Sequence, residues 1–232
     1  MPENATTERH PGRLVAWLGF VLALTALNYL GRYVGDGETP GDIAYRWESS
    51  VAVVVQFGLM LGALLLITIG LPKRPIFGLR RPRSWPRALG LAVAALVVIY
   101  LGSLAYTGIL SLLGDFDPTE EQGLVPDGWD SSRVAPFVAF FLAVTLLAPV
   151  VEELTYRGVG YGLMEPYGVA VAVVGTGLLF GLTHGLLIGL PVLAFFGIVV
   201  GWLRARTDSV YPGMLLHATF NGIALLVAVG SG

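Results

Sequence analysis

The sequence has no cysteine among its 232 residues. This absence excludes disulfide bonds, a thiolate nucleophile, a zinc site with cysteine ligands and a prenylated cysteine at the C-terminus of the chain itself. Cysteine usage therefore says nothing about the redox compartment of the protein.

Charged side chains are scarce as well. The chain has 14 Lys and Arg and 16 Asp and Glu, or 13% of its residues, whereas about a quarter of the residues in soluble domains are charged. Hydrophobic residues make up 55% of the chain. The formal net charge of −2 lacks the basic excess that nucleic-acid binding needs, so we expect no nucleic-acid partner. The composition predicts a protein of the lipid bilayer.

Seven apolar segments are candidate membrane spans, and every charge falls outside them: residues 14–30, 51–71, 88–113, 134–151, 168–187, 190–203 and 211–229. A hydrocarbon core of ~30 Å needs about 20 helical residues, so the sixth segment is marginal in length. The first follows two arginines, as in a signal peptide, but no clear cleavage site follows it. We predict an all-α, polytopic integral membrane helical bundle with about seven transmembrane helices (range six to eight). Residues 1–232 are expected to form one membrane domain.

Basic residues predict the orientation of the bundle, because Lys and Arg accumulate on the cytoplasmic side. The N-terminus and every second connection after it hold eleven of them, six in the loop of residues 72–87. The alternate set of connections holds three. We therefore expect a multi-pass protein of the cell membrane with its N-terminus in the cytoplasm.

Polar residues on apolar helices are functional candidates, because a charge at the centre of a membrane helix costs on the order of 2.5–3.5 kcal/mol. Three such groups lie in the C-terminal half of the chain: Glu152, Glu153 and Arg157 after the fourth span; Phe180 and His184 in the fifth; His217 and Asn221 in the seventh.

The two adjacent glutamates point in directions about 100° apart on a helix. Glu153 and Arg157 are four residues apart in the favourable order, which predicts that they pair. Glu152 is then left on a neighbouring face, where a low-dielectric setting would suit it to act as a general base. The alternative is that the fourth span ends at Val151 and the charges lie among lipid headgroups.

The histidines have an alternative reading as well. His184 alone could be a hydrogen-bonded core histidine, and His217 with Asn221, on one helix face, could be hydrogen-bonding partners between helices. A zincin motif, a nucleophile elbow and a second intramembrane aspartate are all absent from the sequence. One or two Glu, two His and one Asn remain, a set suited to amide hydrolysis by activated water.

In this order on successive apolar helices, Glu152-Glu153-x-x-x-Arg157, Phe180-x-x-x-His184 and His217-x-x-x-Asn221 resemble the CPBP family. This family comprises CAAX prenyl endopeptidases of the Ras-converting type and bacteriocin-processing enzymes, and is also called the Abi family. The segment Phe77–Arg81 is similar to one often seen there. The motif-bearing core would span about residues 76–230.

The resemblance implies an intramembrane endopeptidase, of metallo- or glutamate type, that acts on membrane-anchored or lipid-modified protein substrates. In this reading Glu152 and His184 activate water, and His217 and Asn221 form the oxyanion site. Glu153 and Arg157 would support Glu152. A cofactor is not required, although Glu152, His184 and His217 could ligate Zn²⁺ with one position open to water.

The predicted spans place the main catalytic pair at different depths. Glu152 lies ~27 Å along the fourth span and His184 ~24 Å along the fifth, which runs in the opposite direction. Continuation of the fourth helix toward Met164, with a bend permitted by Gly181 and Gly185, would bring them together. Two non-proteolytic alternatives stay open, namely a proton-coupled transporter and a bacteriocin-immunity scaffold. A transporter commonly shows repeated halves, whereas the polar groups here all lie in the second half.

Overall fold

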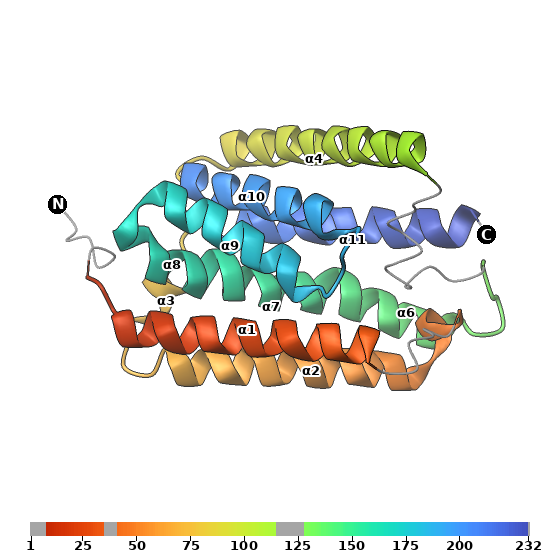
Figure 1. Ribbon diagram of the computed structural model, residues 1–232, viewed down its shortest axis with the longest axis horizontal. Helices are drawn as coiled ribbons and strands as arrows, with labels where there is room; N and C mark the ends of the chain where they lie inside the picture. The colour runs from red at the N-terminus through yellow and green to blue at the C-terminus, as the bar shows by residue number, and fades with distance from the viewer. Residues whose placement is uncertain (1–7, 35–40, 115–127, 232) are drawn as a thin grey trace.

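The computed structural model describes residues 8–34, 41–114 and 128–231, and in these ranges it contains helices and no strand. Six of the described helices are long and apolar enough to cross a membrane (Figure 1). They are α1 (Pro11–Tyr33), α2 (Trp47–Ile67), α4 (Trp85–Leu113), the continuous helix Val134–Tyr167, α10 (Leu190–Thr207) and α11 (Tyr211–Ser231). A seventh apolar helix, α9 (Val169–Thr183), is shorter. The predicted all-α, multi-pass membrane bundle is confirmed.

The helices run back and forth between two ends of the bundle (Figure 1). One end, here called the basic end, holds the start of α1, the segment 68–84 with the short helix α3 (Lys73–Ile76), the segment 161–168 and the connection between α10 and α11. The 3-10 turn η1 (Ile43–Tyr45), the segment 128–133 and the end of α11 lie at the opposite end. Alternate connections therefore share an end, as predicted, and the cytoplasmic N-terminus stays a prediction.

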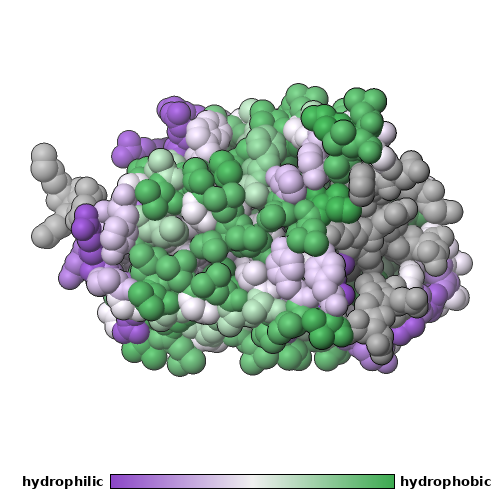
Figure 2. Space-filling view, viewed as in Figure 1, coloured by the Kyte–Doolittle hydropathy of each residue, from purple (hydrophilic) through white to green (hydrophobic). Residues whose placement is uncertain are grey.

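Hydrophobic side chains cover most of the visible face between the two ends, and hydrophilic ones gather at the ends, the basic end among them (Figure 2). Ion pairs join the connections there, because Asp208 accepts from Arg80 and from Arg204, at 2.9 Å in each case. Burial raises the pKa of Asp208, but the hydrogen bonds from these two arginines outweigh it and hold the pKa below its usual range. Ion pairs thus hold together the polar connections at the basic end.

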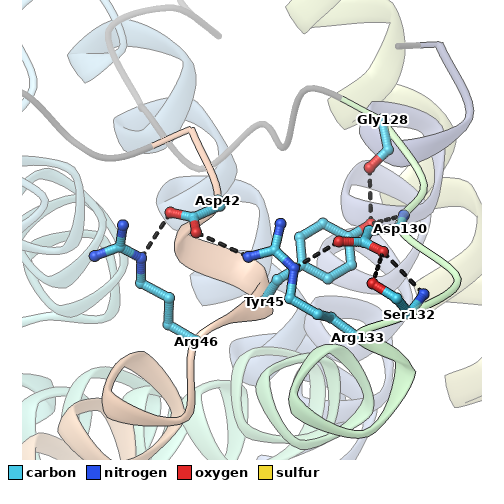
Figure 3. A network of polar contacts seen from close by, with 7 residues as sticks. All are labelled: Asp42, Tyr45, Arg46, Gly128, Asp130, Ser132 and Arg133. Carbon is cyan, nitrogen blue, oxygen red and sulfur yellow. Dashed lines mark hydrogen bonds and ion pairs between the residues drawn. The ribbon is translucent and has the colours of Figure 1, made fainter.

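A second polar network fixes the opposite end (Figure 3). Arg133 bridges Asp42 at 2.8 Å and Asp130 at 2.5 Å, and Arg46 binds Asp42 at 2.6 Å. Hydrogen bonds from Ser132 and Arg133 lower the pKa of Asp130 to about 2. The network ties the connection before α2 to the start of the fourth apolar helix.

The fourth apolar helix is much longer than the predicted span 134–151. It consists of α6 (Val134–Leu142), the π-helical turn η2 (Ala143–Leu147), α7 (Ala148–Glu153), the π-helical segment η3 (Leu154–Gly160), α8 (Tyr161–Met164) and the 3-10 turn η4 (Glu165–Tyr167). Pro149 is the second residue of α7, and the widened turn before it accommodates a residue that cannot donate a backbone hydrogen bond.

Continuation of this helix overturns two expectations from the sequence. The helix does not end at Val151, and three charges, those of Glu152, Glu153 and Arg157, lie within a span rather than outside it. Arg157 therefore does not belong to a connection in the count of basic residues. The physical reason is that Glu153 and Arg157 pair with each other at 3.0 Å, so their burial does not require the helix to stop.

The next two helices differ from their predicted spans, 168–187 and 190–203. Helix α9 ends at Thr183, two residues before Gly185, whose positive φ of 68° breaks the helix. Helix α10 continues to Thr207, because the buried Arg204 finds polar partners inside the bundle. The fourth helix thus continues toward Met164, as predicted, whereas α9 does not bend at Gly181 but stops before Gly185.

Small residues let α9 and α10 pack closely. A Cβ atom at Gly197 would lie 2.5 Å from the carbonyl oxygen of Gly177, and one at Gly181 would lie 2.7 Å from the backbone nitrogen of Ala194. Close backbone approach through small residues is a common way for membrane helices to associate. Here it brings the carbonyl of Gly197 within 2.9 Å of Arg157 Nη2.

The segment Phe77–Arg81 packs against the fourth apolar helix where Gly158 leaves room. A Cβ at Gly158 would lie 2.8 Å from the carbonyl oxygen of Phe77. Gly78 has a φ of 64°, and its carbonyl accepts from the backbone of Val210 at 3.2 Å. This segment is therefore part of the packed bundle rather than a free loop.

We expect Gly158→Ala to destabilise the protein by about 1–3 kcal/mol, because overpacking forces the backbone of Phe77 to shift. Gly90→Ala is the matched control, since it lies in helix α4 with nothing within 4 Å of the added methyl group. It should be neutral or slightly stabilising. Thermal unfolding of the detergent-solubilised variants measures both effects. Equal unfolding temperatures would contradict the close contact at Gly158.

Candidate active site

The fourth apolar helix carries a buried ion pair at its centre. Arg157 Nη1 donates to Glu153 Oε1 at 3.0 Å, and both side chains are fully buried. The guanidinium also donates to the carbonyl of Gly197 and lies 4.6 Å from the ring centre of Phe180. The pairing predicted from the spacing of these two residues is confirmed, and it fixes the face of the helix that points into the bundle.

His217 on α11 faces both glutamates. Its Nδ1 lies 3.1 Å from Glu153 Oε1, and its Nε2 lies 3.5 Å from Glu152 Oε2. The Glu152 side chain keeps 15% of its surface exposed, whereas that of Glu153 is fully buried. The contact between Glu153 and His217 was not predicted from the sequence, since the two residues are 64 positions apart and no local spacing indicates it.

A glycine lets α11 approach this cluster. A Cβ at Gly213 would lie 2.9 Å from Glu153 Oε2, an atom that is buried and has no hydrogen-bond partner among the described residues. A larger residue at this position would push the carboxylate away from His217. The close approach of the two helices therefore depends on the absence of a side chain at Gly213.

His184 follows the last residue of α9 and lies inside the bundle. Its Nδ1 is 2.7 Å from the carbonyl oxygen of Phe180. Because a carbonyl only accepts, Nδ1 carries the hydrogen, and in the neutral ring Nε2 is left with a lone pair.

Phe180 packs between the two histidines, with ring centres 4.6 Å from His184 and 5.6 Å from His217. It is almost fully buried. The ring of His217 also contacts Phe196 at 4.8 Å. Aromatic rings thus fix the orientation of both histidines, a stronger role for Phe180 than its position in the sequence indicated.

Asn221 lies one turn beyond His217 on α11, about 6 Å further along the helix axis. Its Nδ2 donates to the carbonyl oxygen of Val144 at 3.1 Å, within the π-helical turn η2. This bond orients the amide and leaves its second N–H hydrogen for another acceptor. The structure places Asn221 on the same helix as His217, as predicted. Asn221 contacts the N-terminal half of the fourth apolar helix, whereas His217 contacts the glutamates further along it.

Metal ligation is a separate question for this set of side chains. Within the part of the chain that the structure describes, no three His, Asp or Glu residues come together as a group that could hold a metal ion. Zinc ligation by Glu152, His184 and His217 stays a prediction from the resemblance.

A comparison with protein families gives one result for this region. Residues 134–223 match the model of the Rce1-like type II CAAX prenyl endopeptidases. The match contains all of the predicted catalytic and supporting residues. Comparisons with curated proteins and with solved structures gave no match.

Proposed function

Because residues 134–223 match the model of the Rce1-like type II CAAX prenyl endopeptidases, we propose that the protein is an intramembrane endopeptidase. It would hydrolyse peptide bonds of membrane-anchored or lipid-modified proteins, prenylated CAAX-type substrates among them. The observation that carries the proposal is the approach of Glu152, on the fourth apolar helix, to His217, on α11, at 3.5 Å, with Phe180 packed between His217 and His184. Its partners are the lipid bilayer and the anchored substrate.

Glu152 and His184 activate water in the proposed mechanism. Glu152 is the glutamate without an arginine partner, and it keeps some exposure. It accepts a proton from water as the water oxygen attacks the carbonyl carbon of the scissile bond. His184 orients that water by accepting its other hydrogen at Nε2. When the C–N bond breaks, the proton held by Glu152 passes to the leaving nitrogen.

His217 and Asn221 stabilise the oxyanion that forms during the attack. His217 donates through Nδ1 to Glu153, so it can donate through Nε2 as well only when the ring carries both protons. Asn221 supplies the amide hydrogen that its bond to Val144 leaves over. Preorganised donors of this kind supply much of the catalysis in many hydrolases.

Asn221→Ala is expected to lower kcat by roughly 10²–10³, as the loss of one oxyanion donor does. The KM should change little, because the bond forms fully only in the transition state. Steady-state kinetics on an anchored peptide separates the two parameters. An effect on KM alone would assign Asn221 to substrate binding instead.

Cleavage of an anchored peptide in phospholipid vesicles tests the proposed function. Purified protein is reconstituted with a fluorogenic peptide that carries a prenyl group, and in parallel with the same peptide on a saturated acyl anchor. We expect wild type to cleave at least one of them and Glu152→Gln to cleave neither. Cleavage of both anchors would indicate that the bilayer, not the prenyl group, selects the substrate. No cleavage by wild type, or equal cleavage by Glu152→Gln, would contradict the proposal.

A further inference from the structure

Helix α9 ends within the thickness of the membrane. Its 15 residues rise only ~22 Å, less than the ~30 Å of a hydrocarbon core. The turn of residues 184–189 follows before α10 begins, and Figure 1 shows this turn well short of the end that α4 and α11 reach. Backbone groups that leave a helix at this depth need hydrogen-bond partners from the protein.

The first partners come from the turn itself. The backbone N–H of His184 donates to the carbonyl of Gly181 at 3.3 Å, and that of Gly185 donates to Leu182 at 3.2 Å. The Nδ1 atom of the His184 ring donates to the carbonyl of Phe180. His184 therefore caps the helix that carries it, and its ring orientation depends on the path of the turn.

Three further carbonyls are bound by side chains from two other helices. Asn28 Nδ2 of α1 donates to the carbonyl of Thr183, and the hydroxyl of Tyr29 donates to that of Leu186 at 3.1 Å. From the other side, the hydroxyl of Tyr106 on α4 donates to the carbonyl of Ile188 at 2.8 Å. The turn is thus held by helices that lie outside the family-matched residues 134–223.

The backbone of α1 also packs directly against the turn. A Cβ atom at Gly185 would lie 3.0 Å from the backbone carbonyl carbon of Asn28, and the φ of Gly185 is 68°. The hydroxyls of Thr25 and Thr183 lie 3.4 Å apart. A shift of α1 would therefore move the turn, and the His184 ring with it.

We propose that Asn28, Tyr29 and Tyr106 are positioning residues that fix the orientation and the tautomer of His184. They bind the carbonyls that flank His184 in the chain, and the turn they hold directs Nε2 toward the site. The inference rests on the proposed function for its kinetic consequence, but its structural part concerns the ring alone. A site within residues 134–223 is then completed by α1 and α4.

Kinetics of tyrosine variants give the first test. Tyr29→Phe and Tyr106→Phe each remove one hydroxyl group and keep the ring. Because small misplacements of a catalytic group cost up to about 10²-fold, each should lower kcat by roughly 10-fold, with KM nearly unchanged. Tyr100→Phe is the matched control on α4, since its buried hydroxyl has no hydrogen-bond partner among the described residues. Wild-type kinetics in both test variants would overturn the kinetic role.

The ¹⁵N NMR spectrum of histidine-labelled protein tests the ring itself without any substrate. The chain has three histidines, so His10→Gln and His217→Asn suffice to assign the signals. Wild type should show a protonated Nδ1 and an unprotonated Nε2 at His184. In Asn28→Leu, which keeps the branched shape and the number of heavy atoms without a donor, we expect a mixture of tautomers, and the same change, though smaller, in the two tyrosine variants.

The two measurements distinguish failure of the inference from failure of the proposed function. If wild type cleaves nothing, the proposed function fails, and the NMR signal alone decides the positioning role. If wild type cleaves and neither kcat nor the His184 signal changes in any variant, the inference is overturned. If Asn28→Leu does not fold, the tyrosine variants decide by the same two criteria.

Discussion

Replacement of Glu152 by glutamine is expected to abolish detectable cleavage, a loss on the order of 10²–10⁴-fold for a general base. Glutamine has nearly the same shape but accepts no proton from water. Expression should stay near normal, because Glu152 is partly exposed and its described ion-pair contact is that to His217 at 3.5 Å. Cleavage of an anchored substrate, normalised to protein abundance, measures the effect.

Glu48→Gln provides the control for Glu152→Gln, since Glu48 is an exposed glutamate in the first turn of α2. It should leave both cleavage and abundance unchanged. Retained turnover in Glu152→Gln would contradict the assignment of the base. Loss of cleavage in both variants would show that the assay responds to changes unrelated to the site.

Arg157→Ala is expected to destabilise the protein strongly, by about 3–5 kcal/mol, because it leaves a buried carboxylate without its cation. The guanidinium holds Glu153, the carbonyl of Gly197 and the face of the Phe180 ring together. We therefore expect a lower unfolding temperature and lower abundance in membranes. Thermal unfolding in detergent and quantitative blotting measure these effects.

Arg46→Ala is the matched control for Arg157→Ala. Arg46 and Asp42 form an acid-first pair four residues apart, as Glu153 and Arg157 do, but their side chains are 46% and 35% exposed. Exposed pairs contribute little to stability. Equal unfolding temperatures of the two variants would contradict the buried role of Arg157. Equal abundance of Glu152→Gln, Glu153→Ala and Arg157→Ala would contradict the division of labour between the two glutamates.

The sequence predicted the helices well because apolar length and composition determine membrane spans directly. The predicted span 88–113 lies within α4, Trp85–Leu113, and the predicted span 211–229 lies within α11. The predicted ends of spans were wrong where polar side chains have partners inside the bundle. Arg157 and Arg204 are buried within helices, and hydropathy alone counts such residues as the ends of spans.

Local spacing predicted the local part of the site and no more. The pair of Glu153 with Arg157 follows from a separation of four residues on a helix. The contact of Glu153 with His217 and the bond of Asn28 to the turn after α9 join distant parts of the chain. They depend on how the helices pack, which a single sequence does not reveal. The catalytic roles of Glu152, His184, His217 and Asn221 stay predictions until activity is measured.

Quantitative mass spectrometry of membrane-protein termini tests the central claim most directly. Cells that express wild type are compared with cells that express Glu152→Gln at the same level. Proteolysis predicts new termini only with the wild type, and these termini would identify the substrate and the cleaved bond. Identical termini in both cells, with both proteins inserted in the membrane, would contradict proteolysis and favour a transporter or an immunity scaffold.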